Sequence, residues 1–195
     1  MNLNILKPSQ AVESAFEKPN LAIALVLVLL PSLAFLAGQM LYGFDVLGYA
    51  IFEIVLAYVM FFILVLVVYA VGIIFNGEKA KNQLLQVLSA VSLLQIVSLI
   101  FVVLSFLTMN LVFSPEAIEF AAIAENPNQI GGFIAANPGS VNLVFFAIST
   151  IIAIALIALG IFVLYKCIRK ITETRAFTAL VLAAIILFIF GIMPI

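Results

Sequence analysis

The sequence contains no histidine and only one cysteine, Cys167. A single cysteine cannot form an intramolecular disulfide, and the usual zinc sites draw on several Cys and His ligands. Nucleophilic triads that use a histidine base are excluded as well. We therefore expect no metal, no cofactor and no catalytic residue, and we predict that the protein is not an enzyme.

Charge is also scarce. Only 9% of the residues are charged and 67% are hydrophobic, whereas about a quarter of an average soluble domain is charged. So few polar residues cannot cover a water-soluble globule, so the lipid bilayer must surround most of the chain. The net charge of −1 gives no basic surface for nucleic acid, and we expect no nucleic-acid partner.

Long apolar stretches dominate what is present, and about 20 apolar residues suffice to cross a hydrocarbon core of roughly 30 Å. Five stretches qualify, at residues 21–41, 46–75, 84–113, 141–165 and 176–193. We predict an all-α membrane protein in which residues 1–195 form a single domain, a bundle of five transmembrane helices. Residues 1–20 form a leader, and residues 114–140 form a long outer loop.

The cations predict the orientation of these spans. All eight Lys and Arg lie in the leader or in the connections that follow the second and fourth spans. Because cationic loops stay in the cytoplasm, we place the N-terminus inside and the C-terminus outside a cell membrane. A cleaved signal peptide is the alternative for the first span, since residues 31–34 resemble a cleavage site. However, Glu13 and Glu17 are unusual for a signal peptide.

The leader has the pattern of a short amphipathic helix. Pro8 suits a first helical turn, and Val12 and Phe16 share one face at helical spacing. Pro19 disfavours continuing the helix through Lys18. We predict a helix on the inner membrane surface, anchored by Val12 and Phe16, with a frayed leader as the alternative.

The outer loop begins with Ser114, Pro115 and Glu116, which suit an N-cap, a first-turn proline and an acid favoured by the helix dipole. Two turn signals follow at residues 126–127 and 137–138. We expect this apolar loop to rest on the outer interface or to cap the bundle.

Glu53 is the one charged residue well inside a predicted span, about seven residues into the second. Ser105, Ser149 and Thr150 are expected at a similar depth, so the four side chains are a candidate intramembrane polar cluster. One hypothesis makes Glu53 a proton or cation site, because charges inside membranes mark such paths. The other makes it a structural acid, hydrogen-bonded between helices.

Polar residues in the third span recur about every three positions from Asn82 to Ser98. This row winds around a helix, so we favour interhelical hydrogen bonds over a pore face. The pairs Ser149/Ala153 and Ala179/Ala183 have small-xxx-small spacing. They indicate close packing within the bundle or, alternatively, a homodimer seam.

Three segments carry a resemblance to a known family. They are the leader with Pro8, Phe16 and Pro19, the stretch FNGEKAKNQ after the second span, and YKCIRKITETRAFTAL before the fifth. With five predicted spans and a cytoplasmic N-terminus, the chain resembles short prokaryotic members of the Yip family, the Ypt/Rab-interacting membrane proteins. The resemblance implies a non-enzymatic membrane protein whose eukaryotic relatives act in vesicle traffic and associate with one another.

Our leading hypothesis is a non-enzymatic helical bundle that organises membrane or recruits partners. Besides the lipid bilayer, we expect further copies of the chain or other membrane proteins as partners. The alternative is a small transporter or channel, or a subunit of one, that uses Glu53. A wet cavity reaching Glu53 would favour transport, and a dry, filled bundle would favour the scaffold.

Overall fold

The structure is a computed structural model that describes residues 1, 3–44, 46–124 and 126–190. In this part of the chain the regular elements are all helical, and they are α1 (Pro8–Glu17), α2 (Leu21–Leu41), α3 (Ala50–Asn76), α4 (Glu78–Lys81), α5 (Leu84–Val91), α6 (Leu94–Val112), α7 (Pro115–Ile123), α8 (Pro127–Ala136), the 3₁₀ turn η1 (Pro138–Ser140), α9 (Leu143–Thr172) and α10 (Ala176–Phe190).

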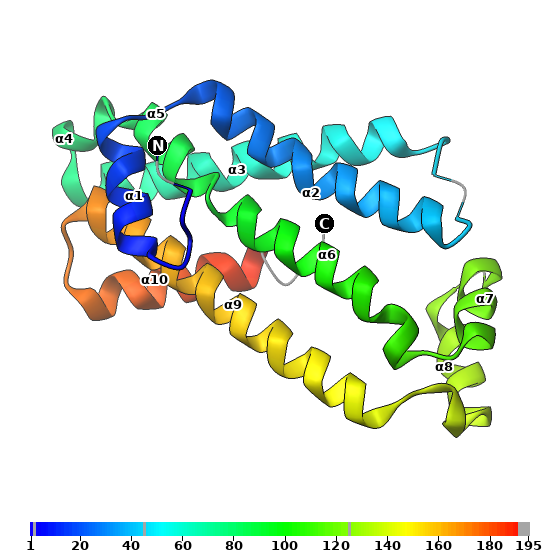
Figure 1. Ribbon diagram of the computed structural model, residues 1–195. Helices are drawn as coiled ribbons and strands as arrows, with labels where there is room; N and C mark the ends of the chain where they lie inside the picture. The colour runs from blue at the N-terminus through cyan, green and yellow to red at the C-terminus, as the bar shows by residue number, and fades with distance from the viewer. Residues whose placement is uncertain (2, 45, 125, 191–195) are drawn as a thin grey trace.

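The long helices lie side by side as a bundle (Figure 1). Helix α2 packs on α3 and α6, α9 packs on α6 and α3, and α10 folds back along α9. Within the described residues, four helices have the length and apolar character of membrane spans: α2, α3, α5 joined to α6, and α9. The sequence pattern predicts five. The 15 residues of α10 extend only about 22 Å, and residues 191–193 of the predicted fifth span lie outside the described residues.

Two predicted boundaries differ from the structure. Residues Val46–Tyr49 form a turn, so α3 begins at Ala50, four residues later than the hydrophobic run predicts. At the other extreme, α9 runs to Thr172, past the predicted end at residue 165. It continues because Leu164, Ile168 and Ile171 keep helical spacing through the cationic segment, and all three are fully buried.

The predicted third span is interrupted at Ser92 and Leu93, which separate α5 from α6. Leu93, Gln95 and Ile96 donate their backbone N–H groups to carbonyls three residues back rather than four. The Ser92 hydroxyl donates to the Ser89 carbonyl at 2.9 Å. Serine bonds to a preceding carbonyl bend helices, so Ser92 explains a break that contains no proline or glycine.

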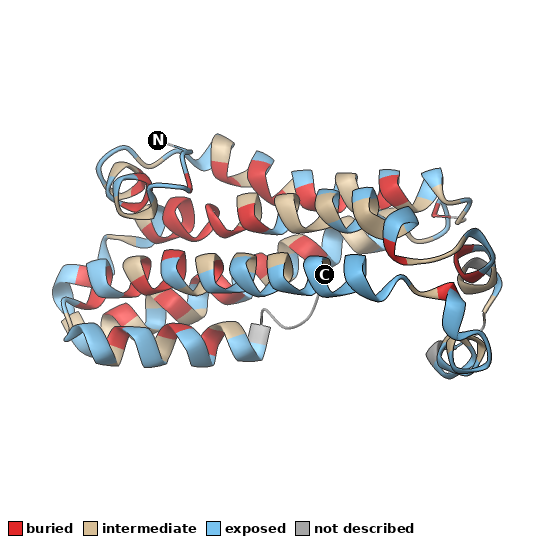
Figure 2. Cartoon of the chain, turned by 60° about the horizontal axis from the view of Figure 1, so that its bottom comes forward, coloured by how far each residue is buried: buried red, intermediate tan, exposed pale blue. Residues whose placement is uncertain are grey.

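The core lies towards one end of the bundle. Buried side chains gather on the N-terminal half of α2, the C-terminal halves of α3 and α9, and on α1, α5 and α10. The opposite half of α9 is mostly exposed (Figure 2). At the packed end the backbones approach closely at Gly72, where an added Cβ would lie 2.4 Å from the Cδ1 atom of Ile171.

The two ends of the bundle differ in charge. Helices α1 and α4 and the α9–α10 connection meet at one end, and α7 and α8 lie at the other (Figure 1). The first end carries all eight Lys and Arg and only four of the nine carboxylates. We call it the cation-rich end, and the other the α7–α8 end.

The outer loop at the α7–α8 end is helical, and its turn signals act as helix caps. Ser114 caps α7 by accepting from the N–H of Ala117 at 3.3 Å, as its sequence predicts. Its hydroxyl also holds the pKa of Glu116 below its ordinary value. Asn126, expected in a turn, instead caps α8 by accepting from Gln129 N at 3.2 Å. An Asn-Pro pair serves both purposes, because proline suits the first helical position.

Candidate functional site

Three members of the predicted polar cluster line one slot. Ser105 on α6 and Ser149 and Thr150 on α9 face a cavity of about 370 Å³ between these two helices. The rest of the lining is mostly apolar and includes Phe101, Leu104, Met109, Val112, Phe113, Phe146, Ile152, Ala153 and Leu156. Among the described residues, the lining comes from α6, its C-cap and α9, and Glu53 of α3 is not part of it.

The hydroxyls of this slot bond within their own helices. Ser105 donates to the Phe101 carbonyl at 2.8 Å, and Thr150 donates to the Phe146 carbonyl at 2.9 Å. Thr108, which also lines the slot, donates to the Leu104 carbonyl at 2.8 Å. Because these protons are already shared with the backbone, the slot presents a mainly apolar surface, which suits hydrocarbon better than an ion.

Glu53 lies in the first turn of α3 and is partly exposed. The late start of α3 explains this position, since the prediction placed Glu53 two turns deep. A carboxylate in a first turn is favoured by the helix dipole. No hydrogen-bond or ion-pair partner of its side chain occurs among the described residues. The slot does not reach Glu53, so it lends no support to transport through this residue.

The polar row of the third span has two structural roles at the cation-rich end. Ser89 is fully buried, and its hydroxyl accepts from the backbone N–H of Asn20 at 2.9 Å. This bond ties the start of α2 to α5, while Asn20 itself caps α2 by accepting from Ile23 N. Ser92 shapes the break between α5 and α6, as described above. Both roles agree with hydrogen bonding rather than a pore face.

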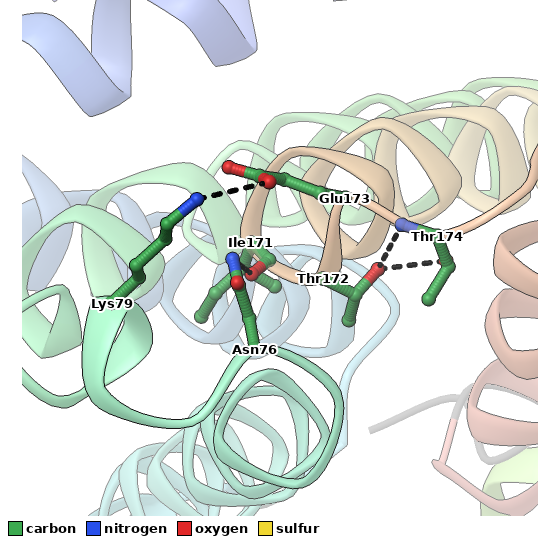
Figure 3. A network of polar contacts seen from close by, with 6 residues as sticks. All are labelled: Asn76, Lys79, Ile171, Thr172, Glu173 and Thr174. Carbon is green, nitrogen blue, oxygen red and sulfur yellow. Dashed lines mark hydrogen bonds and ion pairs between the residues drawn. The ribbon is translucent and has the colours of Figure 1, made fainter.

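The cation-rich end is held together by contacts between segments far apart in the sequence. The Asn76 side-chain amide donates to the Ile171 carbonyl at 3.0 Å, and Lys79 pairs with Glu173 at 3.5 Å (Figure 3). Glu173 ends α9 in a left-handed conformation, at φ 52°, and Thr172 shares a hydrogen bond with Thr174 at 2.8 Å. The end of α3 and the α9–α10 connection are thereby joined.

These contacts involve residues that the sequence did not single out as a site. Asn76 and Lys79 belong to FNGEKAKNQ, and Glu173 belongs to YKCIRKITETRAFTAL. They are two of the three segments that carry the family resemblance. The available signal was the placement of polar residues directly after long apolar runs.

Helix α1 completes this surface. It packs on α5 and α9, with Ala11 and Ala15 fully buried and Val12 only 2% exposed. Phe16 is half-buried and packs against the same core. Val12 therefore anchors α1 to the bundle itself, and its side chain is covered by protein. We call α1, α4, the last two turns of α9 and residues 173–175 the cationic platform.

A bundle of long apolar helices with its cations at one end defines a multi-pass integral membrane protein. The family model of the Yip1 domain matches residues 3–195. The chain therefore belongs to the Yip1 domain family, and the match covers all three segments on which the resemblance rests. No curated protein and no solved structure matches the chain.

Proposed function

We propose that this protein is a non-enzymatic scaffold of the cell membrane that recruits other membrane proteins through its cationic platform. In this proposal five helices cross the bilayer, with α10 as the fifth. The N-terminus and the platform face the cytoplasm, and the C-terminus lies outside. The one-sided cations support this orientation, because cationic loops stay in the cytoplasm.

The observation that carries the proposal is the construction of the platform. Its parts come from α1, α4 and α9, and they are fixed by buried contacts of Val12 and by the bond from Asn76 to Ile171. The Lys79–Glu173 pair lies on top, with both side chains more than half exposed. A rigid, exposed and charged surface on a membrane-embedded base suits recognition of a partner, because little conformational entropy is lost on binding.

Orientation is tested by thiol labelling in intact cells. Single cysteines replacing Lys79 or Lys170 in a Cys167→Ala background should resist an impermeant thiol reagent, and one replacing Asn128 should react. Equal labelling at all three positions contradicts the proposed topology.

Recruitment is tested by photo-crosslinking in the native membrane. A crosslinking residue at Lys79 should capture a discrete set of proteins, and the same residue at Asn128 serves as the matched control at the α7–α8 end. A captured species of twice the chain mass identifies a second copy, and other masses identify different partners. If the two positions capture the same set, or position 79 captures none, recruitment by the platform is wrong.

A further inference from the structure

One face of α9 combines aromatic rings with cations at the edge of the platform. Phe162, Tyr165, Lys166 and Arg169 are spaced by three and four residues, so they lie on one side of the helix. The Lys166 ammonium lies over the Phe162 ring at 5.1 Å from its centroid and 5.5 Å from that of Tyr165. Arg169 donates to the Tyr165 hydroxyl at 3.0 Å. We call these four residues the α9 cationic face.

The depth of this face follows from the length of the apolar run that precedes it. Residues 143–164 of α9 contain no charged side chain, and they extend roughly 33 Å. This matches a hydrocarbon core of roughly 30 Å. The core therefore ends near Tyr165, and Lys166 and Arg169 fall within the next 5–7 Å or so, which is the headgroup layer.

The cations of this face have no carboxylate partner. In the described part of the chain the ion pairs are Lys79–Glu173 and Lys81–Glu78. Glu173, four residues after Arg169, turns to Lys79 where α9 ends. Lys166 and Arg169 thus stand three residues apart with like charge, an arrangement that destabilises a helix unless an anion lies nearby.

The position of Lys166 makes the need for an anion more specific. Lysines near the ends of membrane helices usually extend their ammonium groups towards water. Here the ammonium instead lies back over Phe162, four residues closer to the hydrocarbon. Phe162 is 41% exposed, so this side of α9 is open to lipid. The anion abundant at this depth is the phosphate of the surrounding phospholipids.

We propose that the α9 cationic face binds the phosphate headgroup of an anionic phospholipid. Lys166 and Arg169 contact the phosphate from two sides, since a guanidinium donates paired hydrogen bonds and an ammonium adds a compact charge. Tyr165 holds the guanidinium in place, and the exposed ring of Phe162 packs against the first part of an acyl chain. This site is separate from the partner-binding platform surface at Lys79.

Native mass spectrometry of the purified chain in detergent tests this proposal. Phosphatidylglycerol and phosphatidylcholine are titrated separately, and the ratio of their apparent affinities is measured. The wild type should prefer phosphatidylglycerol. Because a cation near the membrane surface contributes about fivefold, Lys166→Gln should lower the preference about fivefold. Lys166→Gln with Arg169→Gln should lower it about thirtyfold.

Two controls separate the site from net charge and from folding. The double variant Lys7→Gln/Lys81→Gln removes the same charge from the same end and should keep the wild-type preference. Lys166→Arg/Arg169→Lys keeps both charges and should keep most of it. The proposal is wrong if the Lys166→Gln variants retain the wild-type ratio or if the Lys7/Lys81 control loses as much. It is equally wrong if inorganic phosphate or glycerol 3-phosphate binds as tightly as the lipid.

Discussion

Gly72→Ala tests how closely α3 and α9 approach beneath the platform. The new Cβ would lie 2.4 Å from Cδ1 and 2.6 Å from Cγ1 of Ile171. Ile171 is fully buried, and its carbonyl is held by Asn76, so it has little room to move. Overpacking of this kind costs about 1–3 kcal/mol, and alanine regains about 0.5–1 kcal/mol over glycine inside a helix. We expect a net loss of about 1 kcal/mol, and at most about 2 kcal/mol.

Thermal melts in one detergent measure this effect, since a loss of 1 kcal/mol lowers the Tm by about 2–4 °C for a chain of this size. Gly160→Ala is the matched control, because its new Cβ meets Leu187 and Leu94 at 3.9 and 4.0 Å, an ordinary contact. It should match or exceed the wild-type Tm. Ile171→Val removes Cδ1, so combining it with Gly72→Ala should cost less than the two single changes added together. Gly72→Ala melting with Gly160→Ala, or an additive double variant, would refute the close approach.

Three further predictions concern polar and leader residues. Ser89→Ala should lower stability by about 1–3 kcal/mol, because the Asn20 N–H loses its acceptor; the exposed Ser98→Ala is the control, and equal melts would contradict the tie between α2 and α5. Phe16→Glu should speed backbone hydrogen exchange across residues 8–17 while the bundle melts near the wild-type temperature, and unchanged exchange would show that α1 does not depend on this contact. Glu53→Gln and Glu53→Ala should both melt within about 0.5 kcal/mol of the wild type, and a loss of about 1–3 kcal/mol for the alanine alone would restore the structural hydrogen-bond hypothesis.

Glu53 shows where sequence reasoning about depth reaches its limit. The hydrophobic run from residue 46 suggested that Glu53 lies deep in a helix. In the structure the chain makes a turn at Val46–Tyr49 before α3 begins at Ala50. Hydropathy measures how apolar a segment is, and it does not register where a helix starts. An error of one turn moved the acid from the predicted cluster to the helix end.

The slot between α6 and α9 shows a partial success of the same reasoning. Ser105, Ser149 and Thr150 were matched by counting residues from the predicted span ends, and the structure places all three in one lining. Counting works there because neighbouring antiparallel helices rise by the same 1.5 Å per residue. It could not exclude Glu53, because depth along the bundle says nothing of which helices are neighbours.

The sequence by itself determined the class of the protein and the polarity of its ends. Continuous apolar runs commit a chain to helices in lipid, since every backbone group must be bonded within its own segment, and α2 has the predicted bounds. The one-sided cations are likewise a property of sequence order. The platform was decided by tertiary structure alone. The bond from Asn76 to Ile171 joins residues 95 positions apart, and the Lys79–Glu173 pair exists because glycine at position 72 lets α3 and α9 approach closely. Such contacts depend on which helix faces pack together, a choice made by side-chain shape across the whole bundle rather than by any local pattern.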